Sequence, residues 1–335
     1  MTMNNEGEYT RLLARSFSPI VVTGASGFIG NCAVRRLMQE GCEVHVLLRA
    51  EAQMWRLYDL LDRITIHRVD LCDGQSVRAA LEKISPQTIL HAATHGAYEW
   101  QSDARRILET NVLGTFNLLE AALAVHAKIF ISTGTSSEYG YKDQPMSEAD
   151  RLEPNSIYAI AKATQTHLCC LLAKNSPMSI VAFRLFSIYG PWEEPKRLMP
   201  ILIRRARAGL PLELSSPNTA RDFIYVDDLL DILLDFARMA ALNGEIINLG
   251  SGVQSTLREV VEIVQEVVGA RSEVRWNALS ARKWDAKRWQ AEISKARALL
   301  GWSSQCTLRE GVRRMAEWME EHGEEIYERR ESYNL

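Results

Sequence analysis

The chain has 335 residues, of which 47% are hydrophobic and 24% are charged, and its formal net charge at pH 7 is −3. This composition is ordinary for a water-soluble globular protein long enough for two domains. Nucleic acid and membranes are not expected partners, because positive charge is not in excess and no apolar run approaches about 18 residues. Six cysteines without metal-like spacing are typical of a reduced, cytoplasmic protein.

Strand-like and helix-like patterns alternate through the first half of the chain. Residues 1–17 are polar and mixed in charge, and we expect them to form a loose extension. The long helices are expected at 103–125 and 155–174. Strands are expected at 19–23, 43–48, 64–69, 87–91, 128–132 and 179–185. This alternation predicts an α/β fold with a doubly wound parallel sheet, the Rossmann arrangement.

The pattern changes after Gly190-Pro191, where loops punctuated by proline begin. We expect helices at 198–208, 226–239, 256–269, 291–300 and 307–322, a hairpin leading toward Phe223, and a strand at 246–249. Residues 18–185 with about 225–249 are therefore predicted to form the first domain. Residues 186–224 and 250–320 are predicted to form a smaller, discontinuous α/β domain.

A glycine turn follows the first strand and leads into a helix. It contains Gly24, Ser26, Gly27, Phe28, Ile29 and Gly30. Glycines at such a turn let the backbone approach a pyrophosphate, which the positive end of the helix then stabilises. A plain strand-to-helix turn is the alternative interpretation.

A hydroxyl-rich loop and a tyrosine–lysine pair come later in the chain. Thr135, Ser136 and Ser137 follow the strand expected at 128–132, at the sheet edge where α/β proteins bind ligands. Tyr158 lies four residues before Lys162, so both side chains fall on one helix face. The ammonium can lower the tyrosine pKa and make the phenol a proton donor and acceptor.

Together these motifs resemble the short-chain dehydrogenase/reductase superfamily. Segments 184–191, 221–228 and 294–302 are similar to those of its extended branch, the nucleotide-sugar epimerases, dehydratases and reductases, and the resemblance covers about residues 18–320. It implies that Thr135, Tyr158 and Lys162 are catalytic. It also implies that Ser136, Ser137, Ser187, Arg221 and Arg282 contact a nucleotide-diphosphate sugar; Ser187 replaces the asparagine usual in that branch.

The cofactor is expected to be NADP, with NAD as the alternative. Arg49 lies where an acidic residue would bind the ribose of NAD, and an arginine there suits the 2′-phosphate of NADP. Glu51 could instead serve NAD. Further candidate contacts are Asp70 and Leu71 after the third strand, and Ala92 and Ala93 after the fourth. His91 is interpreted as a packed histidine, and Asp70 has a turn or helix cap as its alternative role.

The hydroxyl loop narrows the expected reaction. Ser136 and Ser137 occupy positions where 4,6-dehydratases carry an acidic pair, so elimination of water is disfavoured. The main hypothesis is an NADPH-dependent reductase of the C4 ketone of a nucleotide-diphosphate 4-keto-6-deoxy sugar. The alternatives are an NAD-dependent 4-epimerase and, from another class, a non-catalytic NADP-binding redox sensor. The family resemblance also implies a homodimer, formed through the helices expected at 103–125 and 155–174.

Overall fold

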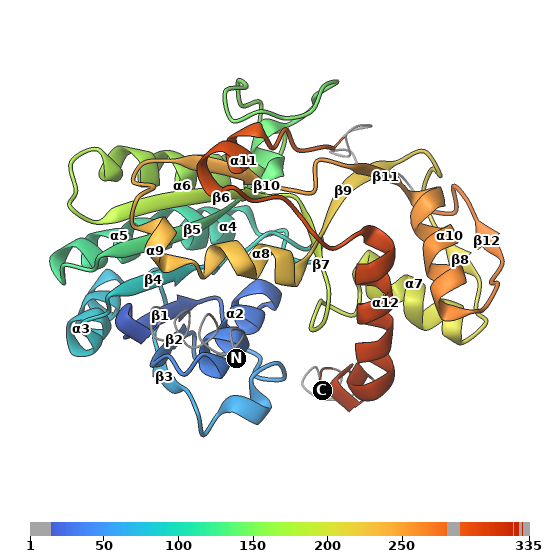
Figure 1. Cartoon of the computed structure of the whole chain (residues 1–335). Helices are drawn as coiled ribbons and strands as arrows, with labels where there is room; N and C mark the ends of the chain where they lie inside the picture. The colour runs from blue at the N-terminus through green and yellow to red at the C-terminus, as the bar shows by residue number, and fades with distance from the viewer. Residues whose placement is uncertain (1–14, 280–288, 324, 328–329, 331–335) are drawn as a thin grey trace, which may run out of the picture. The chain divides into compact units, whose positions relative to one another are not determined.

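The computed structural model describes residues 15–279, 289–323, 325–327 and 330. Its main element is a seven-stranded sheet in the order β10-β6-β5-β4-β1-β2-β3 (Figure 1). The strands are β1 (Ile20–Thr23), β2 (Val44–Leu48), β3 (Thr65–Arg68), β4 (Thr88–His91), β5 (Ile129–Thr135), β6 (Ser179–Leu185) and β10 (Ile246–Leu249). The pairs from β5 to β3 are parallel, so the carboxyl ends of these strands meet at one edge. The expected doubly wound α/β sheet is confirmed.

Helices cover the sheet. They are α2 (Phe28–Gln39), α3 (Gly74–Ile84), α4 (Ala104–Leu108), η2 (Glu109–Leu113), α5 (Gly114–Ala124), α6 (Ile157–Ala173), α8 (Val226–Leu233) and α9 (Phe236–Met239), with short turns η1 (Tyr58–Leu60) and η3 (Ser136–Tyr139). Asp73 caps α3 and Ser156 caps α6 through side-chain hydrogen bonds to the first free backbone amides. The helix expected at 103–125 is interrupted by the π-helical turn η2.

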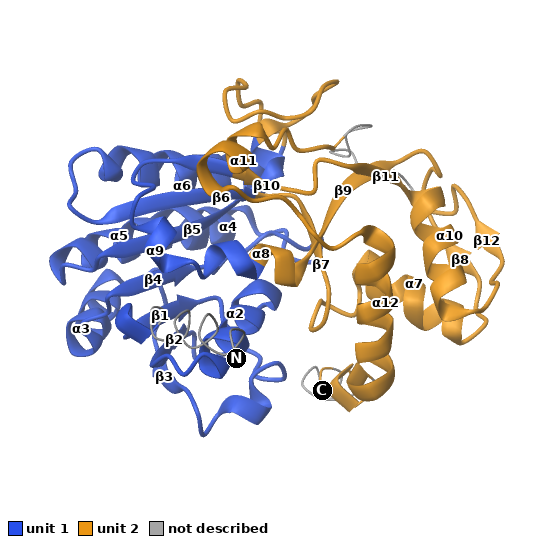
Figure 2. Ribbon diagram, in the orientation of Figure 1, with its two compact units in different colours: residues 1–138, 156–184, 230–247 blue, residues 139–155, 185–229, 248–335 orange. Residues whose placement is uncertain are grey.

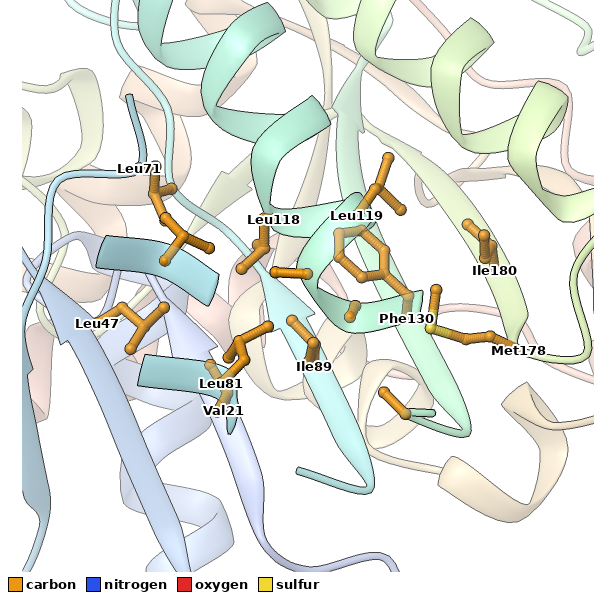
Figure 3. Packing of buried hydrophobic residues seen from close by; sticks show 14 of the residues in the cluster. Val21, Leu47, Leu71, Leu81, Ile89, Leu118, Leu119, Phe130, Met178 and Ile180 are labelled. Carbon is orange, nitrogen blue, oxygen red and sulfur yellow. The ribbon is translucent and has the colours of Figure 1, made fainter. Parts of the chain in front are cut away.

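The core of the sheet explains its apolar, β-branched strands. Every residue of β1 is buried, because a parallel sheet is covered on both faces. Strand side chains such as Val21 and Ile89 pack against side chains of α3 and α5, including Leu118 of α5 (Figure 3). Phe130 and Ile180 extend this cluster across β5 and β6.

The chain divides into two compact units (Figure 2). Unit 1 contains residues 1–138, 156–184 and 230–247, and unit 2 contains residues 139–155, 185–229 and 248–335. The segment 139–155, which the sequence analysis left in the first domain, thus belongs to unit 2. In the part of the chain that the structure describes, no helix is long and apolar enough to cross a membrane.

Unit 2 contains two small sheets. One has the order β11-β9-β7, and the other pairs β12 with β8. Its elements are β7 (Ser187–Tyr189), α7 (Leu198–Arg207), β8 (Leu212–Glu213), β9 (Ala220–Tyr225), β11 (Gln254–Thr256), α10 (Leu257–Val268), β12 (Val274–Arg275), α11 (Ser294–Leu300), α12 (Leu308–Trp318) and η4 (Met319–Gly323). The hairpin expected before Phe223 is wrong: β8 and β9 belong to different sheets, because each finds its partner in a distant segment.

The buried Asp222 carboxylate fixes the loops of unit 2. The Asp222 side chain accepts hydrogen bonds from the backbone amides of Ser251, Gly252 and Ala291. It therefore joins β9 to two segments that are distant in sequence. Hydrogen bonds to a buried carboxylate are among the stronger polar contacts in a fold, so Asp222 has a structural role of its own.

Candidate active site

The glycine turn lies between β1 and α2, with its backbone in close contact with the end of β4. Gly24 has a φ of +70°, and a Cβ there would lie 2.5 Å from the backbone of Ala92 and Ala93. A Cβ on Gly30 would lie 2.3 Å from the Gly24 carbonyl oxygen. Only glycine fits both places. The helix that follows starts at Phe28 with Gly27 as its cap, so its first amides are available to a phosphate, and the residues present fit a dinucleotide.

One arginine, Arg56, reaches this turn from the loop after β2. The Arg56 guanidinium donates to the Ser26 carbonyl oxygen at 3.0 Å and stacks over the Trp55 ring. The backbone oxygen of Arg56 in turn accepts hydrogen bonds from Asn31 and Arg35 of α2. These contacts fix the loop on the helix and place a buried cation beside the turn. Sequence reasoning missed Arg56, since nothing in the local pattern distinguishes it from a surface arginine.

A chain of hydrogen bonds fixes the ends of β1 and β4. His91 is fully buried, with Nδ1 2.8 Å from the Thr23 hydroxyl and Nε2 2.8 Å from the Thr115 hydroxyl. Burial is the main cause that lowers the His91 pKa to about 3, so its ring stays neutral. The Thr23 hydroxyl also accepts from the Ala93 amide. The interpretation of His91 as a packed residue agrees with these contacts.

Four charged side chains lie near the ends of β2 and β3. The Arg49 guanidinium is 3.2 Å from the Glu51 carboxylate, and the Arg106 guanidinium is 3.3 Å from the same oxygen. Arg106 also lies 3.5 Å from an Asp70 oxygen. Asp70 in addition accepts from the Cys72 amide, so it holds the turn after β3. Two cations thus face two carboxylates, and the cluster is balanced in charge.

Leu71 and the two alanines line the neighbouring strand ends. Leu71 is buried, and its carbonyl oxygen accepts a hydrogen bond from Asn117 of α5. Ala92 continues from β4, with its amide donating to the Thr23 carbonyl oxygen at 3.3 Å. Ala92 and Ala93 are half-buried, and the Gly24 backbone packs against them.

The hydroxyl loop begins at the last residue of β5. The Thr135 hydroxyl lies 3.3 Å from the Ser137 hydroxyl and accepts from the Ser137 amide. Ser136 is buried, whereas Thr135 and Ser137 are half-buried. The hydroxyl groups of Thr135 and Ser137 thus lie together on one short turn.

Tyr158 and Lys162 lie one turn apart on α6. Tyr158 is half-buried, and Gly96, with a φ of +94°, passes so close that a Cβ there would lie 3.2 Å from the tyrosine ring. The Lys162 ammonium donates to the Thr133 carbonyl oxygen at 2.6 Å and to the Gln165 side chain at 2.8 Å. Burial lowers the Lys162 pKa from 10.5 to about 8, against the opposing effect of Glu138. The structure thus ties the tyrosine helix directly to the hydroxyl strand.

Two buried polar residues near this site were missed by the sequence analysis. The Asn111 side chain, in the turn η2, accepts from the His95 amide at 2.9 Å and donates to the His95 carbonyl oxygen at 2.7 Å. It therefore fixes the loop after β4. Glu138, which we gave no role, is fully buried and paired with Arg184. A signal for Asn111 exists: it lies four residues after Ile107 on a buried helix face, where a polar residue is unexpected.

The expected substrate residues lie in both units. Ser136 and Ser137 belong to unit 1, while Ser187 lies in β7 and Arg221 in β9 of unit 2. The Arg221 guanidinium is 5.0 Å from the centre of the Trp289 ring and donates to the Ala220 carbonyl oxygen. Arg282 lies outside the described residues.

A Rossmann sheet that carries a tyrosine and a lysine one helical turn apart, beside a hydroxyl at a strand end, defines an extended short-chain dehydrogenase/reductase. The chain belongs to the NAD-dependent epimerase/dehydratase family, whose model matches residues 20–250. It is therefore an enzyme of the class that uses a nicotinamide dinucleotide to act on nucleotide sugars.

Known members of the family resemble the chain along most of its length. The UDP-glucuronate 4-epimerase of Thermodesulfobacterium geofontis is 29% identical over 318 residues, which cover 91% of this chain and 97% of the relative. The dTDP-glucose 4,6-dehydratase of Neisseria gonorrhoeae is 27% identical over 328 residues, covering 89% and 94%.

A solved structure of the UDP-glucuronic acid 4-epimerase from Bacillus cereus, in complex with UDP-glucuronic acid and NAD, matches with a TM-score of 0.79. It is 27% identical, and the match covers 90% of this chain and 99% of that one. These matches favour the epimerase alternative over the 4-ketoreductase of our main hypothesis.

Proposed function

We propose that the protein is an NAD-dependent nucleotide-sugar 4-epimerase. The hydroxyl loop argues against elimination of water, and the matches to 4-epimerases favour this reaction over reduction of a 4-keto sugar. Thr135, Ser136 and Ser137 present hydroxyl groups but no carboxylate, and the one acidic side chain of the loop, Glu138, is buried in a pair with Arg184. Elimination of water needs an acidic or basic side chain from this loop, and the loop offers none. Hydride transfer at C4 needs no such side chain from the loop.

The side chains suit removal and return of one proton at the C4 oxygen. Tyr158 accepts the proton of the C4 hydroxyl as hydride leaves the carbon, and it gives the proton back when hydride returns. Lys162, as an ammonium, stabilises the tyrosinate that is present before the proton is accepted and again after it is returned. Thr135 donates a hydrogen bond to the C4 oxygen and orients it. Bound NAD would be held by the glycine turn from Gly24 to Gly30, and it would supply the hydride acceptor and donor for C4.

Charge balance near the adenosine site supports NAD rather than the expected NADP. Glu51 pairs with Arg49 and Arg106, and Asp70 lies near Arg106, so two carboxylates balance these two cations. A 2′-phosphate would have to compete with this carboxylate, whereas a ribose hydroxyl can donate to it. The proposal therefore assigns Glu51 to the ribose, and it leaves Arg49 as the partner of Glu51.

For the nucleotide sugar we propose a uridine diphosphate sugar, which the B. cereus relative binds. Arg221 and Arg282 are the candidates for its diphosphate, because arginine binds phosphate oxygens through paired donors. Ser187 is a further candidate contact. In this proposal unit 1 binds the dinucleotide and unit 2 supplies these residues.

A homodimer is part of the proposal. Leu108 and Leu113 on one helical segment, and Ile157, Ile160 and Leu171 on α6, each keep at least 41% of their surface exposed. On α6 these residues recur with the spacing of a helix-packing stripe. A second copy that packs the same helices against them would bury this surface in a four-helix bundle. Light scattering at micromolar protein tests this: a monomeric mass would refute it.

The reaction is tested with the purified enzyme, UDP-glucuronic acid and UDP-glucose. Mass spectrometry identifies any nucleotide released on denaturation, and chromatography of the sugars reports conversion. NAD released from the protein, with interconversion of a sugar and its C4 epimer and no added cofactor, is the expected result. Reduction of a 4-keto sugar that consumes one NADPH per turnover would replace this proposal with the 4-ketoreductase. Bound NADP without turnover would favour the redox sensor.

A further inference from the structure

The Glu138 carboxylate lies at the centre of a buried network beneath the hydroxyl loop. One oxygen accepts hydrogen bonds from the Thr135 amide at 2.9 Å and from the Thr166 hydroxyl at 3.1 Å. The other oxygen accepts from the Arg184 Nε at 2.8 Å. The exposed fractions of the two charged side chains, Glu138 and Arg184, are 0% and 2%. This network joins η3, β5, β6 and α6.

A buried ion pair of this kind adds little to the free energy of unfolding. Removing two charges from water costs more than apolar packing of the same volume would, so such pairs need another reason. The strand end is also shaped around the carboxylate, since a Cβ on Gly134 would lie 2.6 Å from a Glu138 oxygen. What the pair holds is the backbone of Thr135, whose hydroxyl is assigned to the substrate.

The same carboxylate acts on Lys162. Burial disfavours the ammonium form of Lys162, and the charge of Glu138 is the largest influence that opposes this effect. Lys162 also donates to the Thr133 carbonyl oxygen, one residue before the glycine that accommodates Glu138. The Glu138 carboxylate and the Lys162 ammonium thus bond to backbone groups of β5 that are two residues apart, Thr135 and Thr133.

We propose that Glu138 is a positioning residue for the epimerase reaction. It fixes the Thr135 backbone through the amide, and so places the Thr135 hydroxyl, and it keeps Lys162 protonated. Arg184 holds the carboxylate ionised and in place. This proposal rests on the proposed function for its chemical meaning, but the coupling between Glu138 and Lys162 is a property of the protein itself.

The first test needs no substrate. Glu138→Gln, Lys162→Met and the double variant form a cycle, and urea unfolding of each is measured at pH 7 and pH 10. Coupling between the two sites is expected at pH 7, where Lys162 is charged, and should vanish at pH 10, where it is neutral. If Glu138→Gln alone fails to fold, the cycle is repeated with Arg184→Met added to every member. Additive effects at both pH values would overturn the electrostatic part of the proposal.

The second test is the pH dependence of kcat. In Glu138→Gln the limb on the alkaline side should move about one pH unit lower, because Lys162 loses its proton more readily. At pH 8.5 kcat should fall on the order of tenfold, with KM changed less than about twofold. An unchanged profile at equal folded fraction would refute the positioning role.

A matched control is Glu194→Gln in unit 2, which breaks another buried ion pair, that with Arg330. It should lower stability without moving the pH profile. Thr166→Val removes one hydrogen bond to Glu138 and keeps the charge, so it too should leave the profile in place. Absence of turnover by the wild-type enzyme on any nucleotide sugar would refute the proposed function. The unfolding cycle needs no substrate, so it would still test the coupling between Glu138 and Lys162.

Discussion

Replacing Lys162 by methionine should remove catalysis without lowering stability. Burial lowers the Lys162 pKa from 10.5 to about 8, a difference worth about 3 kcal/mol at about 1.4 kcal/mol per unit. At pH 7 the folded protein bears this cost, because it holds a charged ammonium out of water. Methionine has a similar length and no charge, so the cost disappears without a cavity.

Two lost hydrogen bonds offset part of this gain. The variant leaves the Thr133 carbonyl oxygen and the Gln165 side chain without their lysine donor, at a cost of about 2 kcal/mol together. The net expectation at pH 7 is a variant as stable as the wild type, or more stable by about 1 kcal/mol. Turnover should fall at least 10²-fold, since the tyrosinate loses its cation.

The dependence on pH gives the sharper assay. Between about pH 8 and 10.5 the unfolded wild-type chain binds more protons at Lys162 than the folded chain does, so wild-type stability rises with pH there. The variant lacks this rise, and at pH 10 it should be the less stable protein. Urea unfolding at pH 7, 8.5 and 10, after bound nucleotide is removed, measures the difference. Lys174→Met, at the exposed end of the same helix, is the control and should show no such trend. A loss above about 3 kcal/mol at pH 7 that does not vary with pH would refute the reasoning.

Four further expectations follow from the site and its supports. Tyr158→Phe should lower kcat on the order of 10²–10⁴-fold while the Kd for NAD, measured by calorimetry, changes less than about twofold. Glu51→Gln should raise affinity for NADP on the order of tenfold, because it leaves two arginines for one carboxylate; an unchanged NADP to NAD ratio in calorimetry would contradict the assignment. Asp222→Asn places an NH₂ group opposite the Gly252 and Ala291 amides, which are donors themselves. The free energy of unfolding, measured from the urea midpoint, should fall by about 1–3 kcal/mol, and NAD binding should be unaltered. Burial and the neighbouring His45 lower the His67 pKa, so stability should decline as pH falls below 6.5; thermal melts of His67→Gln should show a smaller decline, with the contribution of the buried His91 remaining.

The parts of the site that lie on regular elements could be predicted from the sequence. The strand–turn–helix around Gly24 and Gly30 is set by local sterics, which the glycine spacing reports. The Tyr158–Lys162 pair depends only on helix periodicity. Both were placed correctly because the physics behind them is local.

The supports of the site could not be predicted, because they join distant segments. Glu138 and Arg184 are 46 residues apart, and neither shows in its own neighbourhood that the other will neutralise it. The choice between NAD and NADP could not be made from Arg49 alone, because some of the charges around it come from a distant helix. Arg49 pairs with Glu51, two residues further on, but Glu51 also pairs with Arg106, which lies 55 residues further along the chain.

The π-helical turn at Glu109–Leu113 carries a consequence for how this family can vary in length. One residue more or fewer turns everything beyond it by about 100° around the helix axis. In a regular helix here, either Ile107 or Thr115 would leave the buried face that both share now. Single-residue insertions and deletions in this helix should therefore be purged in any descendant that keeps Asn111 on the loop after β4. The tolerant places for length change are the surface loops, and this helix should keep its residue count while its sequence drifts.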